Sequence, residues 1–287
     1  MFAFAIYDQK LQKISLVRDI FGEKPLYYGW NNNMFFFASE LKSITNIKNF
    51  TKDINNKAVS SLLEFCYVRD PHSIYQNVFK LAPGQMAVLS LPSNLNSDIN
   101  TYKKSLKLKK WFSIKDKINS NYNENISVNS IHSIIKKTVQ SRLISDAKLG
   151  CFLSGGIDSS LIASIISDLS KTKYETFTIG FNNKDYDESS KAKLIANHLG
   201  LKNNTLILDE KKMSDIVPKI NDIYDEPFAD SSQIPTFLIS KFASSKLKVC
   251  LSGDGGDELF GGYNRYIFIK NYWKVLNLMP NKLRKLI

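Results

Sequence analysis

Residues 149–166, LGCFLSGGIDSSLIASII, give the clearest indication of the fold of this chain. It starts as a short apolar run, continues as a loop with two adjacent glycines, and ends with apolar residues at the spacing of one helix face. Glycines allow successive backbone N–H groups to point into one concavity, and the N-terminal end of a helix adds a positive partial charge. The order of strand, glycine loop and helix therefore predicts an anion-binding loop.

The side chains of this loop suit a phosphate group and a divalent cation. Ser154, Ser159 and Ser160 offer hydroxyl donors to phosphate oxygens, whereas Asp158 needs a cation between itself and a phosphate. The loop lacks the Lys-Ser/Thr ending of a Walker A motif, which argues against the grip on β- and γ-phosphates seen in kinases and GTPases. The alternative is a tight turn whose serine and aspartate cap the helix.

Strands and helices alternate around this stretch. Apolar patterns predict further strands at 174–179, 204–208 and 248–251, and helices at 131–139, 157–166, 189–199, 213–223 and 234–242. Alternation of this kind predicts an α/β fold with a doubly wound parallel sheet, in which ligands bind at the carboxyl ends of the strands.

A second glycine loop, SGDGGDELFGG at residues 252–262, directly follows the last predicted strand. It carries Asp254, Asp257 and Glu258, and carboxylates packed this closely need a cation or a positive substrate to relieve their repulsion. For Asp257, metal binding is favoured over a role at the N-terminus of the next helix, while Glu258 remains open between the two. Both glycine loops are predicted to lie at the same edge of one sheet.

The first third of the chain has a different pattern of predicted strands and helices. Residues 1–91 contain short apolar and aromatic runs such as MFAFAIYD and PLYYGW, two helix candidates at 38–44 and 57–65, and a Pro-Gly turn before a final strand, which is typical of an α+β domain. From about residue 92 to 125 serine, asparagine and lysine prevail, interrupted by Trp111 and Phe112. This stretch is interpreted as a linker with one aromatic anchor.

Composition excludes several classes of protein. The net charge is +12, but few of the 39 basic residues are arginines and the lysines are scattered, so no nucleic-acid partner is expected and the run at 103–110 is interpreted as solvated linker. No signal peptide is visible, and no apolar stretch approaches the roughly 18 residues that a membrane-spanning helix needs. The three cysteines, Cys66, Cys151 and Cys250, lack disulfide or zinc spacing and are typical of a reducing cytoplasm.

At this point the motifs resemble a known family. LSGGIDSS resembles the pyrophosphate-binding loop of N-type ATP pyrophosphatases, and LSGDGGDELFGGYNRY makes the pair similar to glutamine-hydrolysing asparagine synthetases of the bacterial B type. DEPFADSSQIPTFLISK, FAFAIYD, RDIFGEKPLYY, FASELKSI, LAPGQMAVL and KKWFSI agree in family order. The resemblance implies a remnant of an Ntn-hydrolase glutaminase domain at 1–92, a linker at 93–125 and a HUP-like ATP-pyrophosphatase domain at 126–287.

The resemblance also implies a chemistry. In the family, ATP and Mg²⁺ convert aspartate to β-aspartyl-AMP with release of pyrophosphate, and ammonia from glutamine then yields asparagine and AMP. Ser154, Gly155, Gly156, Asp158 and Ser159 match the pyrophosphate loop, Asp158 and Asp257 match the magnesium carboxylates, and Leu153, Ile179, Ser252 and Gly253 match positions around adenine, ribose and the α-phosphate. Asp254 stands where well-studied members carry a catalytic glutamate.

The chain departs from the family pattern at both ends. Phe2 occupies the place of the nucleophilic cysteine, the glutamine-binding motifs are missing, and the C-terminal helical part with its transition-state lysine has no counterpart. We therefore expect a central fragment that does not hydrolyse glutamine. The expected partners are small molecules (ATP, aspartate, ammonia or glutamine), without nucleic acid or membrane, in the cytoplasm and in a homodimer when full-length.

Two alternatives remain open at the level of sequence. The same adenylation can serve another acceptor, as in β-lactam synthetases or in amidotransferases that act on surface sugars. The chain can also be a non-catalytic remnant that binds ATP without turnover of any acid.

Overall fold

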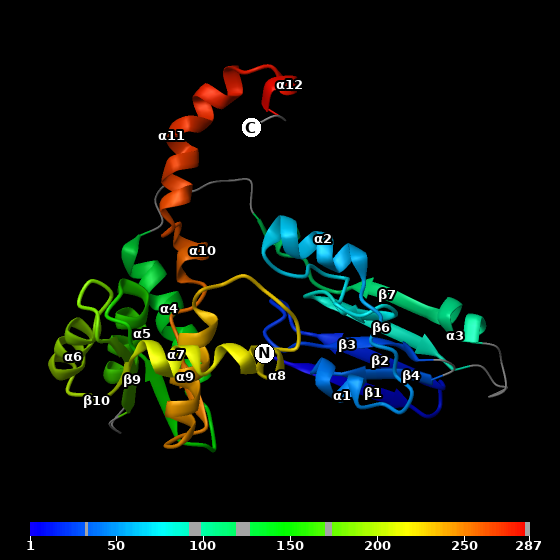
Figure 1. Ribbon diagram of the computed structural model, residues 1–287, viewed down its shortest axis with the longest axis horizontal. Coiled ribbons are helices and arrows are strands. Elements are labelled where there is room, and N and C mark those ends of the chain that lie inside the picture. The colour runs from blue at the N-terminus through cyan, green and yellow to red at the C-terminus, as the bar shows by residue number, and fades with distance from the viewer. Residues whose placement is uncertain (32–33, 92–98, 119–126, 170–173, 285–287) are drawn as a thin grey trace. The chain divides into compact units, whose positions relative to one another are not determined.

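The structure is a computed structural model that describes residues 1–31, 34–91, 99–118, 127–169 and 174–284 (Figure 1). The chain divides into two compact units, each described by itself. Unit 1 consists of Met1–Asn123 and Ile216–Ser231, and unit 2 consists of Glu124–Asp215 and Ser232–Ile287. Within the described ranges, no helix is long and apolar enough to cross a membrane.

Unit 1 is built from two antiparallel sheets. The four-stranded sheet has the order β1 (Ala3–Asp8), β2 (Lys13–Arg18), β6 (Gln85–Ser90) and β7 (Leu106–Lys110). The three-stranded sheet has the order β4 (Met34–Ala38), β3 (Tyr27–Asn31) and β5 (Val78–Lys80), and the helices α1 (Leu41–Thr45) and α2 (Asn56–Phe65) belong to the same unit.

The alternation of side chains along β3 explains how unit 1 forms two cores. Tyr28 and Trp30 point to one face and pack with Leu16 of β2, whereas Tyr27 points to the other face and belongs to a core with Leu41 of α1. Because both faces are covered, every residue of β3 is buried. The aromatic run PLYYGW therefore encodes a central strand.

The predicted linker contains regular structure where it is described. α3 (Ile99–Ser105) is followed by β7, which pairs with β6 in the register Gln85↔Lys110. Leu106 and Leu108 alternate with lysines, which is the period of a half-buried strand, so this signal was available and was not used. The interpretation of 103–110 as a linker was wrong, although its lysines are exposed as expected. Residues 92–98 and 119–126 lie outside the described part.

Unit 2 confirms the predicted parallel sheet. Its strands β8 (Leu149–Phe152), β9 (Glu175–Phe181), β10 (Lys202–Leu208) and β11 (Val249–Leu251) are all parallel, in the order β10-β9-β8-β11. The chain moves outward from β8 to β10 and then returns to the other side of β8. The direction of winding therefore reverses between β8 and β11, and such a switch point is where this fold class binds its ligands.

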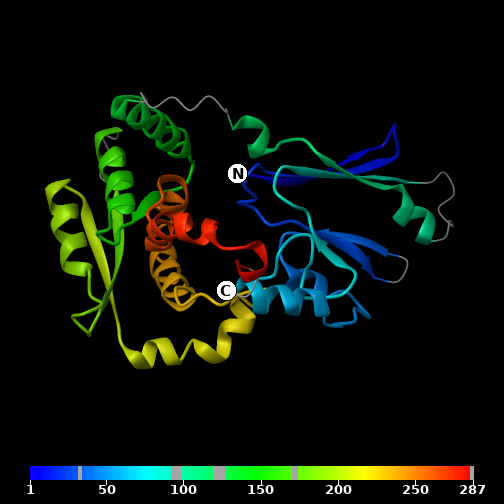
Figure 2. The ribbon, with the colours of Figure 1, turned by 90° about the horizontal axis from the view of Figure 1, so that it is seen from above.

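Helices cover both faces of this sheet (Figures 1 and 2). On one face, Cys151 and Leu153 pack in a core with α4 (Val128–Arg142), α5 (Ile157–Leu169) and α6 (Ser189–His198). On the opposite face, Phe177 packs against Ile239 of α9 (Gln233–Ser244). Unit 2 is thus a three-layer, doubly wound α/β structure.

The helix predicted at 213–223 is wrong as a single element. The structure has α7 (Glu210–Ser214), a 3₁₀ turn η2 (Val217–Lys219) and α8 (Ile220–Ile223) instead. Pro218 lacks an N–H and clashes with the carbonyl four residues earlier, which belongs to Ser214, the last residue of α7. Beyond β11 the chain forms α10 (Gly256–Phe260), α11 (Asn264–Leu278) and α12 (Asn281–Arg284).

Candidate nucleotide site at the switch point of unit 2

The two glycine loops meet at the carboxyl ends of β8 and β11. These strands are neighbours, with Leu251 opposite Cys151. A Cβ atom added to Gly256 would lie 2.5 Å from Cγ of Asp158, and one added to Gly253 would lie 2.8 Å from the backbone nitrogen of Ser159. Only glycine permits this approach, so the second loop packs directly on the start of α5.

Hydroxyl groups hold the first loop in shape. The Ser159 hydroxyl accepts a hydrogen bond from the Ser154 backbone N–H at 3.2 Å and lies 3.0 Å from the Ser154 hydroxyl. The Ser160 hydroxyl donates to the Gly156 carbonyl at 2.6 Å, and Ser159 is buried. The Ser154 hydroxyl also accepts a hydrogen bond from the Gly156 N–H at 3.3 Å, so all three serines predicted to donate to phosphate have local partners. Ser154 is the exposed one of the three.

A third segment, missed at the level of sequence, lies against the first loop. Gly155 adopts φ +87°, and a Cβ there would lie 3.1 Å from both the Ala192 nitrogen and the Lys191 Cβ. Asp187 links the end of β9 to the start of α6. Its carboxylate accepts hydrogen bonds from the backbone N–H groups of Phe181 and Ser189 and from the Ser189 hydroxyl. These bonds lower the pKa of Asp187. An aspartate and serine just before a helix were the available signal.

The second loop presents three carboxylates with different surroundings. Asp254 accepts a hydrogen bond from the Ser252 hydroxyl at 2.9 Å. Glu258 accepts one from the Tyr263 hydroxyl at 2.7 Å, which lowers the pKa of Glu258 and raises that of Tyr263 to about 12. Asp257 packs against Gly262 and directly follows Gly256, the residue that touches Asp158.

The surroundings of the carboxylates predicted to bind magnesium can be compared with the ion pairs of the described residues. Among the described residues, no ion pair joins Asp158, Asp254 or Asp257 to a basic side chain. Those same residues also contain no group of three or more metal-ligating side chains. Magnesium needs only one or two carboxylates when phosphates supply further ligands, so Asp158 and Asp257 fit a magnesium ion that arrives with ATP.

Leu153 and Ile179 have mainly packing roles in the structure. The Leu153 side chain is buried in the core on the α4–α6 face, its N–H donates to the Phe177 carbonyl, and its carbonyl accepts from the Thr178 hydroxyl at 2.8 Å. Ile179 packs on the α9 face. Contacts of these two residues with a nucleotide stay predictions.

Cys151 and Cys250 lie in β8 and β11, and burial raises the pKa of their thiols to about 12 and about 11. Cys151 is buried in the core on the α4–α6 face, and Cys250 is half-buried against the core on the α9 face, so their interpretation as small apolar filler is confirmed.

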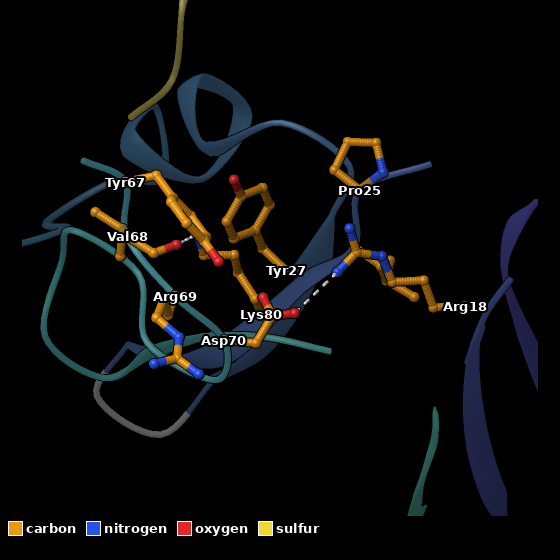
Figure 3. Close-up of a pocket in the computed structure, with 9 residues that line it drawn as sticks. Arg18, Pro25, Tyr27, Tyr67, Val68, Arg69, Asp70 and Lys80 are labelled. Carbon is orange, nitrogen blue, oxygen red and sulfur yellow. Dashed lines mark hydrogen bonds and ion pairs between the residues drawn. The ribbon is translucent and has the colours of Figure 1, made fainter. Parts of the chain in front are cut away.

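Unit 1 holds a cavity of about 450 Å³ to which the sequence had assigned no role (Figure 3). Arg18 donates to the carbonyls of Gly22, Lys24 and Leu81 and lies 4.0 Å from the Asp70 carboxylate. Burial raises the pKa of Asp70. The guanidinium of Arg18 is therefore bonded to the protein itself.

A doubly wound sheet with two glycine loops in contact at its switch point places the protein in the α/β class whose members bind ligands at this edge of the sheet. Comparison with known families agrees with this class. The family described as asparagine synthase matches residues 130–286, and the glutamine amidotransferase domain matches residues 1–102. The chain therefore belongs to the asparagine synthase family, as the motifs predicted.

Curated relatives match along the whole chain. The putative glutamine-hydrolyzing asparagine synthetase 2 of Methanocaldococcus jannaschii is 35% identical over 292 residues, which cover 99% of this chain and 54% of that protein. The glutamine-hydrolyzing asparagine synthetase 1 of Bacillus subtilis is 32% identical over 290 residues, covering 100% of this chain and 43% of that protein. The chain thus spans about half the length of these relatives. Among solved structures, an NH3-dependent NAD synthetase from Campylobacter jejuni matches with a TM-score of 0.34 at 17% identity, over 48% of this chain and 62% of that one.

Proposed function

We propose that this chain carries the ATP-binding half-site of a glutamine-dependent asparagine synthetase, which converts aspartate to asparagine through β-aspartyl-AMP. One observation carries the proposal: the loops 153–160 and 252–262 are in contact through Asp158, Gly253 and Gly256 at the switch point of a parallel sheet. Backbone N–H groups of the first loop and the start of α5 suit the pyrophosphate part of ATP, which leaves as one unit and is held without the lysine of a Walker A motif.

The proposed reaction has two steps. A side-chain carboxylate oxygen of aspartate attacks the α-phosphorus of ATP, the bond between the α-phosphorus and its bridging oxygen breaks, and pyrophosphate leaves. Ammonia then attacks the acyl carbon of β-aspartyl-AMP, AMP leaves, and the nitrogen loses a proton to give asparagine. In the intact protein the ammonia comes from glutamine.

The residues of this chain have distinct roles in that scheme. Ser154, Gly155 and Gly156 hold the departing pyrophosphate, while Asp158 and Asp257 would hold Mg²⁺. The ion neutralises the charge of the leaving group when it is bound. Asp254, oriented by the Ser252 hydroxyl, is the candidate catalytic carboxylate. We also propose a cytoplasmic location, in accordance with the free cysteines, and a homodimer for the intact protein.

Pyrophosphate release from Mg–ATP tests the function. The intact protein is supplied with aspartate, or with glutamate and other carboxylates of similar size, in the presence of ammonium. We expect release to require aspartate and to be accompanied by equal amounts of AMP. Equal rates with another carboxylate would assign the site to a different acceptor, and ATP binding without any release would contradict the proposed synthetase.

A further inference from the structure

Three polar side chains form a hydrogen-bonded network on one face of the sheet in unit 2. Thr176 and Thr178 of β9 flank Phe177, which packs on the α9 face, so both threonine side chains point to the α4–α6 face. The two threonines are 0% and 1% exposed. Asn203 of β10 lies opposite Thr176 in the parallel register. A hydroxyl buried this deeply is stable only when it is hydrogen-bonded.

Asn203 determines the direction of the hydrogen bonds in this network. Its side-chain amide group donates to the Thr176 hydroxyl at 3.0 Å and to the Thr178 hydroxyl at 2.8 Å. Its side-chain oxygen accepts from the Thr205 hydroxyl at 2.8 Å. Because the Thr178 oxygen accepts a proton from Asn203, its own proton is available for another acceptor. The Thr178 hydroxyl donates this proton to the Leu153 carbonyl at 2.8 Å.

The Leu153 carbonyl belongs to the peptide group that opens the first glycine loop. The same planar group carries the Ser154 N–H, so fixing the direction of the carbonyl also fixes the direction of this N–H. The Ser154 N–H donates to the Ser159 hydroxyl at 3.2 Å, and the Ser159 hydroxyl donates to the Gly156 carbonyl at 3.3 Å. Consecutive hydrogen bonds and one rigid peptide group therefore connect β10 to the loop.

The bond from Thr178 lies where β8 ends and the loop begins. Pairing of β8 with β9 reaches as far as Phe152, and the N–H of the next residue, Leu153, still donates to the Phe177 carbonyl at 2.9 Å. In a continued parallel ladder the Leu153 carbonyl would accept from a backbone N–H of β9. The Thr178 hydroxyl donates to it instead, so a side chain of β9 holds the first carbonyl beyond the strand.

We propose that Thr178 is a positioning residue for the loop that binds pyrophosphate, and that Asn203 orients its hydroxyl. The hydroxyl fixes the peptide group between Leu153 and Ser154, and this group sets the direction in which the loop leaves β8. Thr178 thus acts on the ligand through the backbone of the loop. A loop that is already held in its bound conformation loses less entropy on binding. The identity of the ligand rests on the proposed function.

Three variants separate the hydroxyl of Thr178 from its packing. Thr178→Val keeps the branched shape and removes the hydroxyl, whereas Thr178→Ser keeps the hydroxyl and removes a methyl group. Thr176→Val is the matched control, because it makes the same change on the same face, and the Thr176 hydroxyl bonds to Asn203 and to the Lys202 carbonyl at 3.4 Å. If Thr178→Val does not fold, Thr178→Ala compared with Thr178→Ser repeats the test of the hydroxyl.

Each variant is measured as the full chain by residue-resolved hydrogen–deuterium exchange without nucleotide, by titration with Mg–ATP and by urea denaturation. We expect Thr178→Val to speed exchange of the Ser154 amide about tenfold and to raise the Kd for Mg–ATP about fivefold, because the Leu153 carbonyl loses its partner and its peptide group can turn. Thr178→Ser should stay within about twofold of wild type in both quantities. Thr176→Val should lower the stability and leave both unchanged.

Equal exchange of the Ser154 amide in Thr178→Val and Thr176→Val would overturn the proposal. A Kd that follows the free energy of unfolding in both valine variants would also overturn it, and so would faster Ser154 exchange in Thr178→Val with the wild-type Kd. If wild type itself binds no Mg–ATP, the proposed function fails. Exchange of the Ser154 amide then still decides whether Thr178 holds the loop.

Discussion

The carboxylates at the two ends of the parallel sheet in unit 2 have opposite surroundings. At the amino end, Glu175 begins β9 and accepts hydrogen bonds from Lys148 at 2.7 Å and from Asn204 at 2.9 Å, with Lys202 at 3.6 Å. Hydrogen bonds from Lys148 and Asn204 hold the pKa of Glu175 at about 2. At the carboxyl end, Asp158, with Asp254 and Asp257, has no cationic partner within the described part of the chain.

This difference separates a stabilising network from a binding site. A carboxylate that already has its cations gains nothing from a ligand, whereas neighbouring carboxylates without cations repel each other until one binds. Substitutions at the amino end should therefore change stability without changing ATP binding. Substitution of the proposed magnesium ligands at the carboxyl end should do the reverse.

The largest effect is expected for Asp158→Asn. The substitution removes one of the two proposed magnesium ligands, so the affinity for Mg–ATP should fall by at least about tenfold. The free energy of unfolding should stay constant or rise, because a repulsive charge is lost. Calorimetric titration and urea denaturation of the same sample measure both quantities, and tight Mg–ATP binding by the variant would remove Asp158 from the site.

Gly256→Ala tests the contact between the two loops. The new Cβ would lie 2.5 Å from Cγ of Asp158, so the carboxylate must move, and we expect a several-fold loss of Mg–ATP affinity and a destabilisation of about 1–3 kcal/mol. Gly200→Ala is the control, because Gly200 has φ +65° but no atom within 4 Å of its Cβ position. It should lose about 1 kcal/mol of stability through backbone strain alone. Equal ATP affinities of the two variants would disprove the contact.

Glu175→Gln probes the amino end. The depressed pKa means that the stabilisation by Glu175 is fully present above the ordinary pKa of 4.5 and is lost as the pH falls through the folded-state value of about 2. We expect the variant to lose about 1–2 kcal/mol of stability at neutral pH and to show a flatter dependence on pH below about 4.5. Its Kd for Mg–ATP should equal that of wild type. A weakened Kd would mean that the two ends are not independent.

The smallest effect is expected for Glu258→Gln. Glu258 lies in the same loop as Asp257, but its carboxylate is exposed and already accepts the Tyr263 hydroxyl. The affinity for Mg–ATP should change by less than about twofold. A loss comparable to that of Asp158→Asn, measured in the same titration, would place Glu258 among the metal ligands.

The sequence was sufficient to predict the parallel sheet and its loops, because both depend on local patterns. Apolar periodicity marked β8 to β11, and glycines marked the carboxyl ends of β8 and β11. The contact of Gly253 and Gly256 with Asp158 follows from these two facts once β8 and β11 are neighbours.

The remaining features depend on partners far away in the chain. Nothing local to Glu226 indicates its bonds to Lys80 and Ile74. In β7, by contrast, the alternation of Leu106 and Leu108 with lysines was a local signal that the prediction of a linker did not use. Sequence patterns report burial against one face, so a segment held by specific polar contacts leaves no periodic signal. Pro218 was an available signal that the predicted helix at 213–223 did not use.

Hydrogen–deuterium exchange of wild type, measured with and without Mg–ATP, tests whether the nucleotide binds at the two glycine loops. If the nucleotide binds where the two glycine loops meet, protection will increase in residues 153–160 and 252–258, while the amino end around Glu175 and Asn204 stays unchanged. Protection elsewhere, or in only one of the two loops, would contradict the proposed site.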